Sequence, residues 1–227
     1  MHYWVAEIDD AQFEQYSFVP NDEVGEVQWL SLSKAAKLLT YSRDRDLLAV
    51  LEERITNGTA RTTPVIALRH AQAAPAIGWP GNDESRSLTS RGQAQAMQIV
   101  SILRAYQPTR VLTSTAVRCL ATVGPLTHEL ELEPEITASI SQNLSLGWSD
   151  VAQTVNDVLD AGQATVLCSH SPMVPSILDA VSKQCVSVPD KLEALGMLAT
   201  AEFVVLHLAR TDHDLRLVHA EAHGPQI

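Results

Sequence analysis

The sequence predicts an α/β protein whose mainly parallel sheet carries helices on both faces, preceded by a small N-terminal α+β segment. From about residue 63 onward, short apolar runs alternate with longer stretches whose apolar residues recur at helical spacing. Strands separated by helices pair in parallel, and the helices then cover both faces of the sheet. Ligands of such sheets bind beyond the carboxyl ends of the strands. Candidate functional residues are therefore expected at those ends.

Several segments of the larger, C-terminal part are predicted to be strands. The runs "TPVIALRH", "TRVLTS" and "ATVLCSH" are each followed by a helical pattern, so we expect them to lie parallel to one another. Near the end, "AEFVVLHLA" and "LRLVHAEAH" predict a strand pair joined across "RTDHD".

The helices between these strands have recognisable ends. Thr89 is a typical N-cap residue in front of a helix with one apolar side over 89–106. Gly162 is expected to end the helix that begins at about residue 150. Pro172 suits the first turn of the helix that follows the third strand.

Residues 1–58 differ from the rest of the chain. "HYWVAEID" suggests a strand, and "VQWLSLSKAAKLL" and "SRDRDLLAVLEERI" each contain a helical pattern, before the linker-like "TNGTARTTP". One strand and two helices are too few to enclose a core. This part must therefore pack against the larger domain, against another chain or against further sequence. We predict two domains, 1–58 and 59–227.

Composition limits the classes of partner. The 227 residues include 45% hydrophobic residues, enough to fill a core, and carry a formal charge of −11. That charge repels nucleic acids and anionic membranes, so an anionic ligand needs a local cationic pocket. We find no apolar run of membrane-spanning length and no signal peptide, and we expect a cytoplasmic protein. Three cysteines without metal-ligand spacing indicate reduced, buried thiols and no metal site.

Polar groups follow three of the predicted strands. The first strand ends in Arg69 and His70, the second in Ser114 with Arg118 one turn later, and the third in His170. If these strands are parallel neighbours, two imidazoles and two guanidinium groups meet at one edge. Such a cluster stabilises a fold poorly because like charges repel. It suits a phosphate group, which accepts bidentate hydrogen bonds from arginine and further bonds from helix N-termini.

The motifs "LRHA", "RSLTSRGQAQA", "TSTAVRCLAT" and "LCSHSPMV", in this order, resemble the histidine phosphatase superfamily, which includes the phosphoglycerate mutases and the small phosphohistidine phosphatases. The resemblance spans residues 63 to about 222. It implies that His70 takes the phosphoryl group, that Arg69 and Arg118 hold the phosphoryl oxygens, and that His170 donates to them. Nearby guanidinium charges would also keep His70 neutral and nucleophilic.

Further positions match elements of the small phosphohistidine-phosphatase branch, or neighbour its site. Arg86 falls in its "R-P-L-T-x-x-G" element and is expected at the pocket rim, and Ser114 matches its "S-P-x-x-R" serine; other residues replace the proline in both elements. Asp150 is the one carboxylate near the region where many members have a general acid, so either Asp150 serves or the substrate has a good leaving group. Trp79 either stacks on a nucleobase or anchors its Gly- and Pro-rich loop.

The N-terminal segment resembles the closing third of a Nudix hydrolase domain, through "NDEV" and the "WL" before a helix. Fusions of a Nudix domain to a histidine phosphatase domain hydrolyse nucleotides, including oxidised nucleoside triphosphates. The glutamate-rich Nudix box, which binds magnesium, does not occur before residue 60, so the segment is expected to lack Nudix activity.

The resemblance implies a metal-independent phosphatase without cofactor, acting through a phosphohistidine on a phosphomonoester, a nucleotide phosphate or phosphohistidine, with nucleotide-pool housekeeping as one role. Two alternatives stay open. One is a catalytically weak module that binds phosphate or nucleotide, and the other is a fragment of a Nudix fusion that hydrolyses 8-oxo-dGTP. A homodimer is compatible with each.

Overall fold

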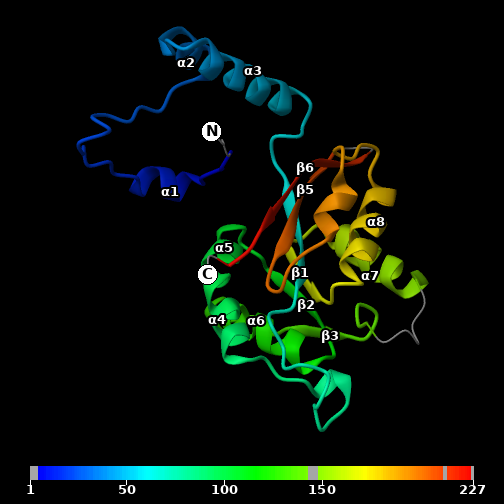
Figure 1. The fold of residues 1–227 in the computed structure, drawn as a ribbon. Coiled ribbons are helices and arrows are strands. Elements are labelled where there is room, and N and C mark those ends of the chain that lie inside the picture. Colours follow the sequence, from blue (N-terminus) through cyan, green and yellow to red (C-terminus); the bar gives the residue numbers. More distant parts are fainter. Residues whose placement is uncertain (1–4, 143–147, 212–213, 226–227) are drawn as a thin grey trace. The chain divides into compact units, whose positions relative to one another are not determined.

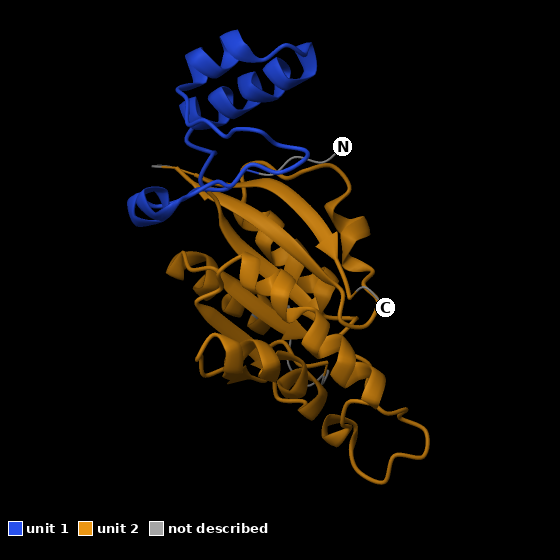
Figure 2. Cartoon of the chain, turned by 90° about the vertical axis from the view of Figure 1, so that its left-hand side faces the viewer, with its two compact units in different colours: residues 1–61 blue, residues 62–227 orange. Residues whose placement is uncertain are grey.

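The computed structural model describes residues 5–142, 148–211 and 214–225 (Figure 1). The chain divides into two compact units, Met1–Arg61 and Thr62–Ile227, which we call unit 1 and unit 2 (Figure 2). Unit 2 contains the predicted strand and helix pattern, and each unit is described by itself below.

A sheet of six strands in the order β3-β2-β4-β1-β5-β6 forms the centre of unit 2, counted over its described residues. β3, β2, β4 and β1 run parallel, whereas β5 and β6 are antiparallel to their neighbours. The predicted α/β fold with helices around the sheet is confirmed, and so is the terminal strand pair. The strands are β1 (Thr63–Arg69), β2 (Arg110–Ser114), β3 (Glu135–Thr137), β4 (Thr165–Ser169), β5 (Phe203–Arg210) and β6 (Leu215–His223).

Helices cover both faces of this sheet (Figure 1). One apolar core joins the sheet to α4 (Ser90–Gln98), α5 (Val100–Ala105) and α6 (Val117–Glu129). The other joins it to α7 (Trp148–Ala161) and α8 (Val174–Gln184). Because β1 is buried on both faces, it reads as an unbroken apolar run.

Side chains of β1 alternate between the two cores. Ile66 and Leu68 face the core of α4, α5 and α6, whereas Val65 and Ala67 face that of α7 and α8. The alternation matters for function because the next two residues, Arg69 and His70, leave the strand toward different sides.

The predicted helix ends are partly right. Thr89 caps α4, accepting from the amide of Gly92 at 3.0 Å, and Gly162 follows α7 with a φ of +61°. The single helix expected over 89–106 is interrupted at Ile99, which separates α4 from α5. Pro172 lies in the turn before α8, whose first turn contains Pro175 instead.

Unit 1 consists of α1 (Asp10–Gln15), α2 (Leu32–Leu38) and α3 (Ser42–Thr56). The strand expected over "HYWVAEID" is wrong for its described residues 5–9, which form no strand. None of the three helices has a buried residue, and Trp29 is 54% exposed beside the rings of Phe13 and Tyr16. Many large apolar side chains of unit 1 are thus exposed and enclose no core, as the small number of elements predicts.

No helix in the described part of the chain combines the length and apolar character that crossing a bilayer requires.

Candidate active site

Parallel pairing brings three strand ends to one edge of the sheet. β4 lies between β1 and β2, with Leu68 opposite Cys168 on one side and Thr113 opposite Cys168 on the other. The chain leaves β1 at His70, whose amide donates to the carbonyl of Ser169 at 2.9 Å. This edge is where a parallel sheet presents its ligand site.

The tautomer of His70 is fixed by the hydrogen bonds of its two ring nitrogens. Its Nδ1 lies 2.7 Å from the carbonyl oxygen of Ala71, an acceptor, so Nδ1 carries the proton. Its Nε2 therefore bears a lone pair, which accepts from Nε of Arg118 at 3.2 Å.

The imidazole of His70 stays neutral. Burial lowers its pKa from 6.5 to about 3, with the nearby His170, Arg118 and Arg69 adding to the effect, against an opposing contribution from the hydrogen bond to Ala71. The cationic neighbours were expected to do this, but burial contributes more. A neutral imidazole with an unprotonated Nε2 is the form that can attack phosphorus.

Arg118 lies at the centre of the cluster and is fully buried. It belongs to the first turn of α6, shortly after the end of β2. Beside its bond to His70, its Nη2 lies 3.1 Å from Nδ1 of His170, and its Nη1 and Nη2 donate to the carbonyl and carboxylate oxygens of Asp83 at 2.6 and 2.8 Å. One guanidinium thus joins both histidines to an anion.

His170 and Ser114 form a second buried pair. Arg118 donates to Nδ1 of His170, so the imidazole proton lies on Nε2, which donates to Oγ of Ser114 at 2.8 Å. The rings of His170 and His70 are 5.3 Å apart and inclined by 69°. Ser114 also contacts Oγ of the buried Ser141 at 3.3 Å, a neighbour that the sequence did not single out.

Arg69 is the last residue of β1, directly before His70, and its charge lies close enough to lower the pKa of that imidazole. Its Nη1 donates to the carbonyl of Leu198 at 2.6 Å. Its Nε is buried and has no hydrogen-bond partner among the described residues. A buried guanidinium N–H without an acceptor is costly unless a ligand supplies one.

The segment after His70 adds an anion that the sequence analysis missed. Within it, η1 (Asp83–Ser85) presents Asp83 to Arg118, and Nη2 of Arg86 lies 2.7 Å from the same carboxylate. Partial burial raises the pKa of Asp83, but hydrogen bonds from Arg86 and Arg118 outweigh it and hold that pKa below its ordinary value. The sequence signal was an acid three residues before Arg86, which alone is unspecific.

Arg86 and Trp79 act mainly within this segment. Arg86 donates to the carbonyl of Ala74 at 2.6 Å, which ties the two ends of the segment together. Trp79 donates its indole N–H to Oγ of Ser85 at 2.9 Å. This contact agrees with the anchoring interpretation of Trp79, one of the two that the sequence left open.

Asp150 is not joined to the cluster. It lies in the first turn of α7, and its carboxylate makes no hydrogen bond or ion pair with another described residue. The stretch 143–147, part of the region examined for a general acid, lies outside the described residues. Near the histidines, the carboxylates are Asp83 and Glu84, the latter 3.3 Å from the hydroxyl of Thr115.

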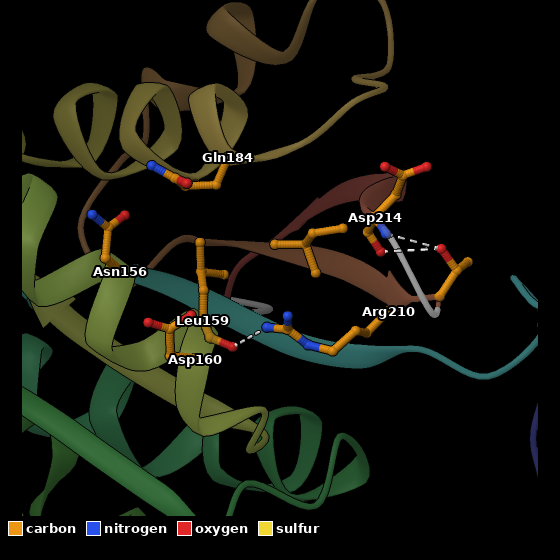
Figure 3. A pocket seen from close by; sticks show the side chains of 8 residues that line it. Asn156, Leu159, Asp160, Gln184, Arg210 and Asp214 are labelled. Atoms are coloured by element: carbon orange, nitrogen blue, oxygen red, sulfur yellow. Dashed lines mark hydrogen bonds between the residues drawn. The ribbon is translucent and has the colours of Figure 1, made fainter.

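A separate hollow of about 430 Å³ lies among the ends of α7, α8 and β5 (Figure 3). It is bounded by the end of α7 with Leu159 and Asp160, by Gln184 of α8, and by Arg210, which donates to the carbonyl of Leu159. Arg210 ends β5, which runs antiparallel to β1, so this hollow lies near the start of β1 and away from His70.

The cysteines are free thiols, with Cys119 and Cys168 buried and Cys185 half-buried. In the described part of the chain, no group of three or more His, Cys, Asp or Glu side chains is arranged to hold a metal ion.

Residues 65–144 match the family described as "Histidine phosphatase superfamily (branch 1)". The matched residues lie within unit 2. Solved structures agree in fold: SixA from Agrobacterium tumefaciens, described as a candidate phosphohistidine phosphatase, is 23% identical with a TM-score of 0.52, covering 72% of this chain and 99% of that one. Mycobacterial glucosyl-3-phosphoglycerate phosphatase is 16% identical with a TM-score of 0.53, covering 72% and 98%.

One curated relative is similar in sequence over most of this chain. The "8-oxo-(d)GTP phosphatase" of Mycolicibacterium smegmatis is 28% identical over 181 residues, which are 78% of this chain. The chain spans about half of that relative, 52% of its length.

Proposed function

We propose that unit 2 is a phosphatase that removes a phosphoryl group through a phosphohistidine on His70. One observation carries the proposal: the Nε2 lone pair of His70 is unprotonated and lies against the fully buried Arg118. A neutral nucleophile beside a fixed cation is what phosphoryl transfer requires, because this chemistry depends on positioning and charge stabilisation.

The proposed reaction has two steps. Nε2 of His70 attacks phosphorus, the N–P bond forms, and the bond from phosphorus to the leaving oxygen or nitrogen breaks. Water then attacks the phosphohistidine, the N–P bond breaks, and inorganic phosphate and neutral His70 are restored. The Nδ1–H bond to Ala71 holds the ring throughout. Arg118 and the free Nε of Arg69 would stabilise the phosphoryl oxygens. His170, whose Nδ1 accepts from Arg118 and whose Nε2–H donates to Ser114, would position Arg118.

The substrate we propose is a phosphorylated compound with a good leaving group, in particular a nucleotide phosphate or a phosphohistidine. The relative from Mycolicibacterium smegmatis is named for an oxidised nucleoside triphosphate, and the Agrobacterium neighbour for phosphohistidine. Among the described residues, Asp150 has no contact that would hold it near the leaving group, which favours a group that needs little protonation. We also propose that the reaction needs no metal and takes place in the cytoplasm.

Residues 1–58 are proposed to be a Nudix-like segment without the Nudix box, followed by the phosphatase domain at 59–227. The proposal rests on the resemblance of "NDEV" and of the "WL" before a helix to the closing third of a Nudix domain. Any activity of a complete Nudix domain then depends on sequence outside this chain.

A phosphate-release screen tests this function. Nucleoside mono-, di- and triphosphates, a phosphohistidine peptide and para-nitrophenyl phosphate are compared with and without EDTA, and His70→Ala is the control. We expect release that resists EDTA and disappears in the variant. Equal release by the variant would overturn the assignment of His70, and loss of activity with EDTA would overturn metal independence. Nucleotide binding without release would favour the catalytically weak module.

A further inference from the structure

Asp83 accepts two hydrogen bonds from the guanidinium group of Arg118. Nη1 donates to the carbonyl oxygen of Asp83 at 2.6 Å, and Nη2 to its carboxylate at 2.8 Å. The pair resembles the two-point contact that a guanidinium makes with a phosphate. Asp83 therefore takes up the donors that a phosphoryl group bound beside His70 would require.

We propose that Asp83 is an internal anion of the phosphate site, which the substrate's phosphoryl group displaces from Arg118. The proposal rests on the proposed function, since it concerns the binding step of the same reaction. It assigns a specificity role to a residue outside the histidine and arginine motifs.

The exposed fractions of the two side chains show which member of the Arg118–Asp83 pair can move. The side chain of Arg118 is 0% exposed and that of Asp83 is 43% exposed. Asp83 belongs to a single short turn in a segment whose tip is open to solvent, with Ile77 96% exposed. Arg118 is fixed in the core, whereas Asp83 can turn toward water.

The exchange avoids an unpaired buried charge. Removing the anion from a buried guanidinium is strongly unfavourable unless another anion replaces it. Arg86 still holds the carboxylate of Asp83, through Nη2 at 2.7 Å, when Arg118 releases it. Both charges thus keep a partner before and after the substrate binds.

Competition of this kind selects among ligands. A monoanion such as acetate offers Arg118 no more than Asp83 already does. A phosphate monoester brings up to two charges and three oxygens, so it can accept more hydrogen bonds than a carboxylate. The site should therefore accept phosphomonoesters and reject carboxylates and phosphodiesters, which carry one charge.

Calorimetric titration of the full chain with inorganic phosphate, and separately with acetate, tests the exchange. Asp83→Asn keeps the size of the side chain and removes its charge, and Asp83→Ser removes both. Asp179→Asn is the matched control, an exposed acid on α8 paired with Lys183. We expect Asp83→Asn and Asp83→Ser to bind phosphate roughly tenfold more tightly than the wild type, because hydrogen bonds to charged groups are strong. Both should bind acetate measurably, and the control should match the wild type.

Unchanged or weaker phosphate binding in the Asp83 variants would overturn the exchange. If neither the wild type nor the variants bind phosphate, the exchange and the proposed function both fail. The first outcome overturns the exchange alone, so the two outcomes are distinguishable. Hydrogen exchange on the wild type gives a second test that needs no variant. The amides of Ser85 and Arg86, bonded to the carbonyls of Asn82 and Asp83, should exchange faster when phosphate binds. Slower or unchanged exchange there would contradict displacement.

Discussion

Nε of Arg118 lies 3.2 Å from Nε2 of His70, so a buried cation donates to the atom that we propose as the nucleophile. The contact has two effects. It orients the imidazole lone pair, and it disfavours protonation of the ring, together with burial. Because Arg118 also contacts His170, one side chain sets the geometry of both histidines. The predictions below follow from this arrangement.

Arg118→Lys should abolish most of the activity although it keeps the charge. A lysine ammonium cannot donate in a plane to His70, His170 and an anion at once. We expect kcat/KM to fall by at least about 100-fold, the range seen on removal of a preorganised donor. Steady-state kinetics measure it, with Arg104→Lys as the control at an exposed ion pair with Glu129. An Arg118→Lys enzyme whose kcat/KM lies within a few-fold of the wild-type value would show that the planar geometry of the guanidinium is unimportant.

Ser114→Ala should slow turnover by roughly tenfold, because Nε2–H of His170 loses its acceptor and the ring loses its orientation. The effect should appear in kcat and leave KM nearly unchanged. Ser182→Ala, at a half-buried serine on α8, is the control. A loss confined to KM would instead place Ser114 in direct contact with the substrate.

His70 should make the protein less stable in acid. Its folded pKa of about 3 lies below the ordinary 6.5, so the unfolded chain binds a proton in this range and the folded chain does not. The contribution is complete above pH 6.5 and is lost as the pH falls toward 3.

From about pH 7.5 to about pH 5, His70 should lower the free energy of unfolding by about 2 kcal/mol. His70→Gln lacks this group and should lose about 2 kcal/mol less over the same range. Urea denaturation of both proteins at the two pH values measures the difference. Parallel losses would mean that the imidazole is protonated in the folded protein.

Gly92→Ala should destabilise unit 2. A Cβ at this position in α4 would lie 2.0 Å from the carbonyl oxygen of Gln72, part of the backbone that follows His70. We expect a loss of about 1–3 kcal/mol or more in the free energy of unfolding, measured by urea denaturation. Gly124→Ala is the matched control in α6, where a Cβ meets nothing within 4 Å. It should stay within about 1 kcal/mol of the wild type, since its helical gain is offset by the following Pro125. Equal effects of the two substitutions would be unexpected.

Sequence patterns predict the parts of the site that strands position. His70, Ser114 and His170 each follow an apolar run, and the pairing of parallel neighbours brings such residues together. Alternation along β1 also explains why Arg69 and His70 diverge.

The remaining contacts depend on tertiary structure. Asp83 reaches Arg118 across 35 positions of the chain from an exposed turn, and no periodicity marks such a residue. The same limit applies to Asp150, which was chosen for its nearness along the sequence and is not joined to the cluster in space. The edge strand β3, with three residues, is too short to produce an alternating pattern.

The central claim is that His70 carries the phosphoryl group, and trapping the intermediate tests it most directly. The wild-type protein is mixed with a radiolabelled substrate from the phosphate-release screen and quenched in base during turnover. We predict labelled protein whose phosphate is stable in base, labile in acid and located on His70, and no label on His70→Ala. Wild-type protein that turns over the substrate without acquiring such label, or label that persists in His70→Ala, would contradict the account.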